Sequence, residues 1–375
     1  MRAEMKKKEV SLDVPDYIKS LIPYPPGKPL EELEREYGIS NAIKLASNEN
    51  PLGPSPKAVE AIKKWLPKLH RYPDGSGYYL KNKLSHLYSI APHNLVLGNG
   101  SNEIIDLLIR VLVRPGKEVI TSHPSFLVYQ KMVQASGGTN KVIELKNFSH
   151  DLSSIASAVT DNTCLIFLDN PNNPTGSVLR KDDFDAFLNM LPQHLLVVLD
   201  EAYMEFAQDA DTPRAVEYLN KDDRIVGLRT FSKAYGIAGL RIGYGIMHKD
   251  VADLLERVRQ PFNVNILAQA AAEASIKDRE HLSKTIENNE QGKAFLTKAL
   301  QNIGFKVYPS YTNFLLIDIG KDAQRLCKAL LPKGVIIRYM GSYGLNNFVR
   351  ITIGTPEENE HCVEAIKEAL SQLEV

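Results

Sequence analysis

The sequence predicts an α/β protein that has a mostly parallel sheet covered by helices, followed by a smaller α+β domain. From about residue 44 to 260, short and almost continuously apolar runs alternate with longer stretches of helical periodicity. This pattern is typical of a parallel sheet that is buried on both faces. After residue 304 the strand-like runs follow one another more closely, before a final helix. The chain has 375 residues, more than one hydrophobic core usually organises, which also favours two domains.

Residues 1–43 are expected to form an N-terminal arm. The arm has a polar start, the proline-rich stretch LIPYPPGKP and a short helix, LEELEREY, that ends at Gly38. Because proline fixes φ and carries no amide donor, we expect the proline-rich part to be extended. Such an arm does not fold alone.

Residues 44–260 are assigned to the large domain and residues 261–375 to the small one. In the large domain the expected strands are NLVLG, EVITS, TCLIFLDN and LLVVLDEAY. In the small domain a helical segment over residues 261–304 precedes the strand-like runs GFKVYPS, NFLLIDI, GVIIRYM and FVRITIG. The amphipathic stretch PEENEHCVEAIKEALSQL predicts the last helix.

Composition disfavours several classes of protein. Lys and Arg together number 45, as do Asp and Glu, so no overall charge attracts nucleic acid or an anionic membrane. No apolar run is long enough to span a bilayer, and MRAEMKKKEV lacks the apolar stretch of a signal peptide. The three cysteines form no CxxC pair and the nine histidines show no ligand spacing, so we expect neither disulfides nor a metal. A cytoplasmic protein that binds small molecules fits this composition best.

Polar residues gather directly after the expected strands, at the edge where open α/β sheets bind ligands. After NLVLG comes NGSN, residues 99–102, which opens a helix near Glu103. The free amides of a helix start attract a phosphate, although an ordinary Asn-Gly turn with a serine cap is an alternative. After TCLIFLD comes NPNNPTG, residues 170–176, whose prolines and glycine hold a turn that presents Asn172 and Asn173.

Two ionisable residues complete this set. Asp200 in DEAY follows an apolar strand, where a half-buried carboxylate needs a donating partner unless it only caps a helix. Lys233 lies in RTFSKAYGIAGLRIGYG, with Thr230 and Ser232 before it and Arg241 after it. By itself the lysine reads as a solvated loop charge, but hydroxyls and an arginine around it describe an amine beside an anion site.

Pyridoxal 5′-phosphate (PLP) uses all of these features. It needs an amine for its aldehyde, an anion site for its phosphate, a carboxylate for its ring nitrogen and donors for its phenolic oxygen. It needs no metal. The sequence therefore indicates a PLP site at the carboxyl edge of the sheet.

The same motifs carry a family resemblance. The order NPNNPTG, LDEAY and RTFSKAYGIAGLRIGYG resembles the fold-type I, PLP-dependent enzymes of the aspartate aminotransferase superfamily. The stretches PYPPGKP, KLASNENPLG, RYPDG and VRITIG make the chain similar to the histidinol-phosphate aminotransferase family, over nearly its whole length. The resemblance implies a seven-stranded type of sheet in the large domain and a homodimer with shared active sites, in which the arm packs on the small domain and the partner subunit.

Carried onto this sequence, the resemblance makes Lys233 the Schiff-base lysine and the general base and acid. It implies that Asp200 pairs with the pyridine nitrogen and that Asn173 and Tyr203 bind the phenolic oxygen. Phe126 would stack on the ring, where many relatives have tyrosine. The catalytic residues implied are thus Lys233, Asp200 and Tyr203. The residues implied to hold the phosphate are Ser101, Asn102, Thr230, Ser232, Arg241 and, from the partner subunit, Tyr72.

The resemblance also implies where the substrate binds. Arg350 in FVRITIG receives an anionic end of the substrate, and Arg338 in GVIIRYM lies nearby on another strand, although alone it reads as a surface residue. Two arginines with Tyr24 of the arm suit the dianionic phosphate of histidinol phosphate, and Asn173 completes the substrate set. The reaction implied is transamination between L-histidinol phosphate and 2-oxoglutarate, in histidine biosynthesis.

Three alternatives stay open at this point. Aromatic amino-acid aminotransferases and threonine-phosphate decarboxylase resemble the same type of sequence and share the residues around the ring. A regulator that keeps the fold without turnover is the third. The arm has no helix-turn-helix pattern and no basic excess, and Lys233 is retained, which disfavours a DNA-binding regulator.

Overall fold

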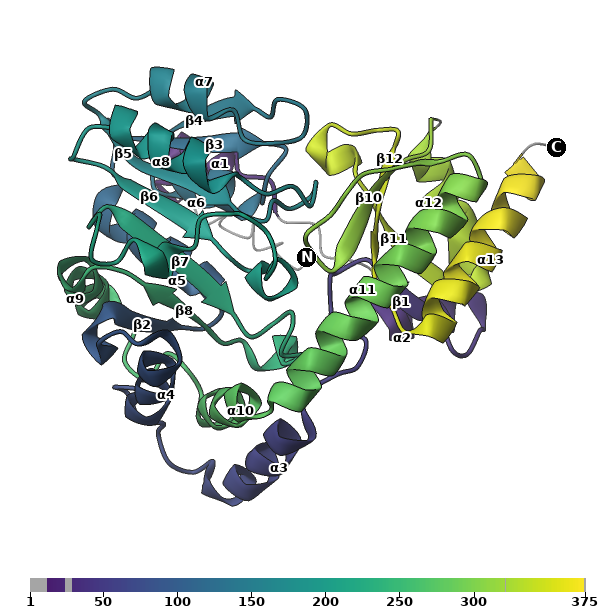
Figure 1. Ribbon diagram of the computed structural model, residues 1–375, viewed down its shortest axis with the longest axis horizontal. Coiled ribbons are helices and arrows are strands. Elements are labelled where there is room, and N and C mark those ends of the chain that lie inside the picture. Colours follow the sequence, from purple (N-terminus) through teal and green to yellow (C-terminus); the bar gives the residue numbers. More distant parts are fainter. Residues whose placement is uncertain (1–11, 24–28, 321, 374–375) are drawn as a thin grey trace, which may run out of the picture.

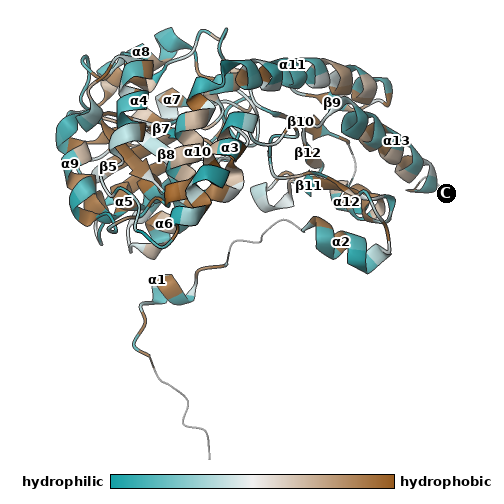
Figure 2. Ribbon diagram, turned by 90° about the horizontal axis from the view of Figure 1, so that it is seen from below, coloured by the Kyte–Doolittle hydropathy of each residue, from teal (hydrophilic) through white to brown (hydrophobic). Residues whose placement is uncertain are grey.

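The computed structural model describes residues 12–23, 29–320 and 322–373. They form two domains side by side, each built on its own sheet, and the long helix α11 (Arg279–Asn302) runs from one to the other (Figure 1). Apolar residues fill the strands, and many helices show a polar outer face (Figure 2). The predicted α/β class, with a larger and a smaller domain, is confirmed.

The larger sheet has seven strands in the order β2-β8-β7-β6-β5-β3-β4. All run parallel except β8, which is antiparallel to both of its neighbours. The strands are β2 (Leu95–Gly98), β3 (Glu118–His123), β4 (Thr139–Glu144), β5 (Thr163–Asp169), β6 (Leu196–Asp200), β7 (Ile225–Thr230) and β8 (Gly243–Ile246). Every residue of β5 is buried, because the strand lies inside the sheet and helices cover both faces.

Alternate residues of β5 point to different helices. Leu165 and Phe167 pack with α5, α6 and α9 on one face, whereas Ile166 and Leu168 pack with α7 and α8 on the other. Toward β2, the second face is covered by α3, α4 and α10. These helices are α3 (Pro56–Trp65), α4 (Tyr78–Tyr88), α5 (Ser101–Leu112), α6 (Val128–Ala135), α7 (Leu152–Ser157), α8 (Lys181–Met190), α9 (Lys249–Val258) and α10 (Ile266–Lys277).

The smaller sheet has five strands in the order β1-β11-β12-β10-β9. β1 is parallel to β11 and the other pairs are antiparallel. The strands are β1 (Ile43–Leu45), β9 (Lys306–Val307), β10 (Phe314–Asp318), β11 (Val335–Tyr339) and β12 (Phe348–Thr352). One face packs on α11, α12 (Ala323–Leu330) and α13 (Pro356–Leu373) through a single apolar core.

Two domain boundaries predicted from the sequence are wrong. β1 pairs with β11 of the smaller sheet, so the chain does not enter the large domain at residue 44. A strand of three residues carries no local signal for the sheet that it joins. At the other boundary, α10 follows residue 261 but packs against α3 and α4. Its buried Ala268 and Ala272 lie in the core of the large domain, so the chain crosses to the small domain only along α11.

The N-terminal arm contacts both domains. Helix α2 (Leu30–Tyr37) packs against the small domain. Helix α1 (Asp16–Lys19) lies on α6 of the large domain, where Nε2 of Gln134 donates to the Tyr17 carbonyl oxygen at 3.1 Å. Residues 24–28 lie outside the described part of the chain, so the extended conformation expected there stays a prediction.

Candidate active site

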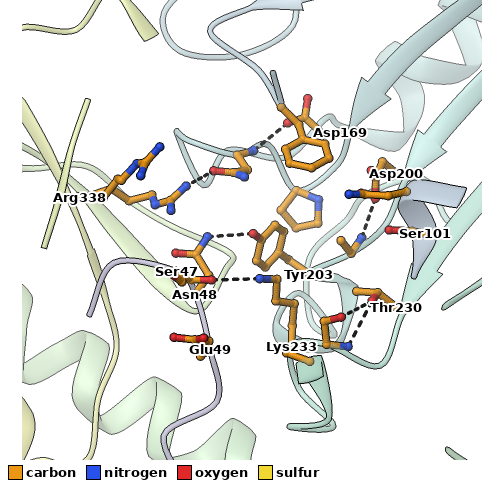
Figure 3. A pocket seen from close by; sticks show the side chains of 18 of the residues that line it. Ser47, Asn48, Glu49, Ser101, Asp169, Asp200, Tyr203, Thr230, Lys233 and Arg338 are labelled. Atoms are coloured by element: carbon orange, nitrogen blue, oxygen red, sulfur yellow. Dashed lines mark hydrogen bonds between the residues drawn. The ribbon is translucent and has the colours of Figure 1, made fainter. Parts of the chain in front are cut away.

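A cavity of about 270 Å³ lies between the two domains, at the carboxyl ends of the strands of the larger sheet. Asp169, Asp200 and Lys233 border it from the large domain, and Arg338 reaches it from the small domain (Figure 3). The predicted site residues that line it are Ser101, Asn102, Phe126, Asn173, Asp200, Tyr203, Thr230, Ser232, Lys233, Arg241, Arg338 and Arg350. Residues far apart in sequence therefore share one chamber.

Lys233 lies in the loop after β7, and its amine faces Ser47 across the cavity (Figure 3). Its Nζ donates a hydrogen bond to the Ser47 carbonyl oxygen at 3.2 Å and lies 5.8 Å from the centre of the Tyr203 ring. Burial lowers the pKa of Lys233 to about 8, and the positive charge of Arg350 acts in the same direction. Such an amine is partly neutral near physiological pH and therefore nucleophilic, which excludes a solvated loop charge.

Asp200 is the last residue of β6 and is buried. Its Oδ2 accepts a hydrogen bond from the Tyr129 hydroxyl at 2.7 Å, and its Oδ1 accepts one from the Ala202 amide at 3.2 Å. Burial raises the pKa of Asp200 to about 7, and the neighbouring Asp169 adds to the rise. No cationic side chain in the described part of the chain forms a salt bridge with Asp200, so the carboxylate is suited to a cationic ligand.

A cradle for an anion lies where α5 begins. Gly100, before the first helical residue Ser101, has φ 76°, a conformation that favours glycine. A Cβ at Gly100 would lie 2.5 Å from Nη2 of Arg241, so only glycine lets the guanidinium approach the helix start. Nη1 of Arg241 donates to Ser232 Oγ at 3.4 Å, and Thr230 Oγ1 donates to the same oxygen at 3.0 Å. Helix amides, hydroxyls and one guanidinium together fit a phosphate.

Asn173 connects the two domains. Its backbone amide donates to Oδ2 of Asp169 at 2.9 Å, and its Oδ1 accepts a hydrogen bond from Nη1 of Arg350 in β12. Tyr203 is held in a similar way, because its hydroxyl accepts a hydrogen bond from Nδ2 of Asn48 at 2.8 Å. Burial raises the pKa of Tyr203, which keeps its hydroxyl protonated as a donor.

Phe126 supplies an aromatic wall. Its ring packs edge-on against Tyr129, with 5.4 Å between ring centres. Tyr129 in turn stacks on Phe167 of β5 at 4.7 Å. A ring held in this way is a suitable surface for a flat, conjugated ligand.

Arg338 and Arg350 are register partners on β11 and β12, so both side chains leave the small sheet on one face and reach the cavity. Nη2 of Arg350 donates to the Ala46 carbonyl oxygen at 3.0 Å. Its Nε is buried without a hydrogen-bond partner among the described residues. An unpaired buried donor is costly, which indicates that an anionic ligand completes this end. The surface interpretation of Arg338 is excluded.

One predicted residue, Tyr72, does not line the cavity of its own chain. Tyr72 is 81% exposed and stacks on Phe262, with 4.8 Å between ring centres. It belongs to the surface of this chain, and its role toward a partner subunit stays a prediction. Tyr24 lies outside the described residues.

Among the residues that were not predicted, Asn48, Tyr129 and Asp169 line the cavity, and His150 lies next to Asp169. Asp169 ends β5 beside Asp200, its register partner on β6, so the criterion of a polar residue at a strand end would have found it. Tyr129 bonds a residue 71 positions away, and Asn48 one 155 positions away. Neither pairing leaves a local signal in the sequence.

The side chains that line the cavity fit PLP. One cavity presents an amine, a buried carboxylate, a phosphate cradle and an aromatic wall, which are the groups that the cofactor requires. Gly100 has no Cβ, and the space that a Cβ would occupy lies next to Arg241, where the phosphate is expected. The unpaired Nε of Arg350 leaves an anion site for a substrate at the opposite end.

The comparisons with known proteins agree with this chemistry. The family model described as aminotransferase class I and II matches residues 40–366. A histidinol-phosphate aminotransferase of Desulfotalea psychrophila is 49% identical over 98% of this chain and 98% of that relative. Histidinol-phosphate aminotransferase 1 of Nitrosococcus oceani is 46% identical over 95% of this chain and 96% of that relative. The crystal structure of histidinol-phosphate aminotransferase from Sinorhizobium meliloti in complex with PLP superposes with a TM-score of 0.89, at 30% identity over 97% of this chain and 99% of that chain.

Two further features bear on the predicted partners. Over the described residues, no helix combines the length and the apolarity needed to cross a membrane. Within the same residues, no three His, Cys, Asp or Glu side chains gather as a metal ion would require.

Proposed function

The chain belongs to the class I and II aminotransferases, and from that premise we propose that it transfers an amino group between L-histidinol phosphate and 2-oxoglutarate. The products are imidazole-acetol phosphate and L-glutamate, and the pathway is histidine biosynthesis. One observation carries the proposal: the amine of Lys233, with its lowered pKa, shares a cavity with Asp200, a phosphate cradle and two arginines. The names of relatives at 49% and 46% identity support this substrate.

PLP is the cofactor, and the residues that line the cavity support the following proposal for how it would be held. Asp200 takes the ring nitrogen, and its negative charge keeps that nitrogen protonated. Asn173 and Tyr203 bind the phenolic oxygen, and Phe126 covers one face of the ring. The phosphate binds Ser101, Asn102, Thr230, Ser232 and Arg241.

When bound to Lys233, PLP supplies the electron sink that makes the substrate Cα–H bond acidic and stores the amino group between the two half-reactions. With the cofactor bound, Lys233 would move the proton: its neutral Nζ would take the proton from the substrate Cα as base, and the resulting ammonium would give the proton back as acid. The low pKa of Lys233 suits both steps, because a base and an acid work best near the operating pH.

The arginine pair selects the substrate. Arg350 binds the carboxylate of glutamate, with its unpaired Nε available as a donor. Histidinol phosphate brings a dianion to the same place, and Arg338 adds the second guanidinium that this charge needs. We propose that Tyr24 of the arm, which lies outside the described residues, also binds this phosphate.

The first test is the visible absorption spectrum of the purified enzyme with PLP. We expect a yellow protein whose band borohydride fixes onto Lys233, and whose band glutamate and histidinol phosphate each bleach in separate cuvettes. Bleaching by phenylalanine but not by histidinol phosphate would identify an aromatic amino-acid aminotransferase instead. A protein that PLP cannot colour would contradict the whole proposal.

The enzyme is also proposed to act as a homodimer in the cytoplasm. The exposed Tyr72 lies outside its own cavity, where it is available to the cofactor phosphate of a second copy. The three cysteines are all unpaired, as in proteins of a reducing compartment.

A further inference from the structure

A buried histidine and a buried aspartate lie directly behind the binding loop 170–176. The side chains of His150 and Asp169 are only 2% and 5% exposed. Nε2 of His150 lies 3.1 Å from the carbonyl oxygen of Asp169 and 3.3 Å from its Oδ1, and Nδ1 lies 2.7 Å from Ser122 Oγ. Because Nε2 faces two acceptors, it carries the hydrogen, and the Ser122 hydroxyl closes the other side of the ring. The pair therefore joins β3, β5 and the loop before α7.

Asp169 is surrounded by hydrogen-bond donors. Its Oδ1 accepts hydrogen bonds from Ser125 Oγ at 2.6 Å and from Asn172 Nδ2 at 3.0 Å, and it lies 3.3 Å from Nε2 of His150. Its Oδ2 accepts the Asn173 amide at 2.9 Å. A carboxylate only accepts, and its two oxygens satisfy these three donors, whereas the NH2 group of an asparagine in its place would face at least one of them. The site thus requires an aspartate rather than a polar residue in general.

These contacts fix Asn173 from both ends. Asp169 holds its backbone amide, and Arg350 holds its side-chain Oδ1. Within the described ranges, Nδ2 of Asn173 donates to no residue. It is therefore free to donate to a ligand, while the rest of Asn173 is held in place. Asp169 also stands beside Asp200 on the neighbouring strand, with both carboxylates bordering the cavity (Figure 3).

We propose that His150 and Asp169 are positioning residues for Asn173: they hold the loop so that Asn173 Nδ2 points at the phenolic oxygen of PLP while its Oδ1 orients Arg350. This inference rests on the proposed function, because it assigns Asn173 to the cofactor. It extends that function by assigning a role to His150, which does not line the cavity, and to the carboxylate of Asp169, which acts through the loop that it holds. The cofactor end and the substrate end of the site then depend on one buried carboxylate.

The spectroscopic and kinetic part of the test compares three variants of the full-length enzyme. His150→Phe keeps a flat aromatic ring, somewhat larger than imidazole, but removes both hydrogen bonds, and His150→Gln restores a donor toward Asp169. The control is Asp222→Asn, which removes the charge of an ion-paired carboxylate at the amino end of β7, away from the cavity. For each protein one measures the pH midpoint of the visible band of bound PLP, KM for glutamate, and the melting temperature.

A donor to the phenolic oxygen favours its deprotonated form, so loosening Asn173 should raise the midpoint. We expect His150→Phe to raise the pH midpoint by about one unit, which is the effect of one hydrogen bond to a charged oxygen. KM for glutamate should rise severalfold, because Arg350 loses part of its orientation. His150→Gln should restore most of both values. Asp222→Asn should lower the melting temperature and leave both values unchanged.

Hydrogen exchange of the peptide that covers residues 170–176 gives a readout without cofactor. In PLP-free protein, His150→Phe and Asp169→Asn should both speed exchange in this loop, and Asp222→Asn should not. If the midpoint, KM and loop exchange stay at wild-type values while only the melting temperature falls, the pair is structural and the inference is wrong. Failure of the wild-type protein to bind PLP would contradict the proposed function, whereas loop exchange would still decide whether the pair positions Asn173.

Discussion

At the scale of single residues, the site depends on how far burial moves two ionisable groups. Lys233 and Asp200 stand in one cavity, and burial shifts each pKa toward neutrality, to about 8 and about 7. The lysine becomes easier to deprotonate and the aspartate harder, because burial disfavours both charged forms. A cofactor with a cationic ring nitrogen would favour the ionised form of Asp200, since it supplies the positive charge that this carboxylate lacks.

The lowered pKa of Lys233 predicts how PLP capture depends on pH. Only the neutral amine attacks the aldehyde, so the capture rate of PLP-free enzyme should rise with pH through a midpoint near 8. Arg350→Met removes a cation that disfavours the ammonium form, so the midpoint should move upward by about half a unit. Stopped-flow absorbance measures both, with Lys233→Ala as the blank. A midpoint near that of a free lysine would contradict the burial argument.

Asp200→Asn should damage the chemical step more than cofactor binding. An amide cannot hold the ring nitrogen protonated, so kcat should fall about 100-fold to 1,000-fold, the usual cost of removing one electrostatic stabiliser. The phosphate cradle stays intact, so PLP should remain bound. Steady-state kinetics at saturating PLP measures the loss. Normal kcat in this variant would remove Asp200 from the catalytic set.

At the scale of elements, two loops meet so closely that glycine is required. Gly236, just after Lys233, has φ +68°, and a Cβ there would lie 2.1 Å from the carbonyl oxygen of Gly53. This contact sets the lysine loop against the segment that follows β1. Because the obstacle is backbone, no side-chain rotation relieves it.

Gly236→Ala should therefore lower the free energy of unfolding by about 2 kcal/mol or more. Gly239→Ala is the matched control in the same loop, since a Cβ there would have no neighbour within 4 Å and the φ of Gly239 is not positive. The control should change the free energy of unfolding by less than about 0.5 kcal/mol. Urea unfolding of both variants measures the difference. Equal effects at the two positions would show that the loop contact does not matter.

The elements that were predictable are those with a strong local pattern. β5 is a long apolar run because it is buried on both faces, and α13 has clear amphipathic periodicity; both were found. β8 (GYGI) was not, since two glycines in four residues conceal a strand whose neighbours need close approach. β1 has the right composition, but its sheet is decided by β11 at the far end of the chain.

The same holds for the site: residues with a local signal in the sequence were predictable, and residues defined by long-range contacts were not. The strand-end criterion located Asp200, Asn173 and Lys233 because parallel strands end at one edge. The bond between Asn173 and Arg350 joins residues 177 positions apart, and only the packed domains bring them together. His150 lies in a loop whose partners come from other strands, so no sequence pattern marks it.

At the scale of the whole molecule, neither domain holds a complete site. The large domain supplies Lys233 and Asp200, and the small domain supplies Arg338 and Arg350. In the proposed homodimer the partner subunit adds Tyr72. Each site is then built from the large domain, the small domain and the partner subunit.

Shared sites predict complementation between two defective chains. Tyr72→Ala and Lys233→Ala homodimers should each be weak or inactive, but subunit exchange builds heterodimers with one intact site. An equal mixture should recover about one quarter of wild-type activity, because half of the dimers are mixed and each has one working site of two. Activity before and after exchange measures the gain. A mixture that shows only the mean of its components would exclude Tyr72 from the neighbouring site.

The pairing of β1 with β11 also fixes an order of assembly on the ribosome. Ile43 is among the early residues to emerge, yet its register partner is Val335, so β1 waits while the entire larger sheet is translated. Contacts of such long range close late. The large domain, which carries the residues proposed to bind PLP, is therefore translated before the part of the small domain that carries Arg338 and Arg350. A chain released early would have the residues for PLP but lack the arginines for its substrates.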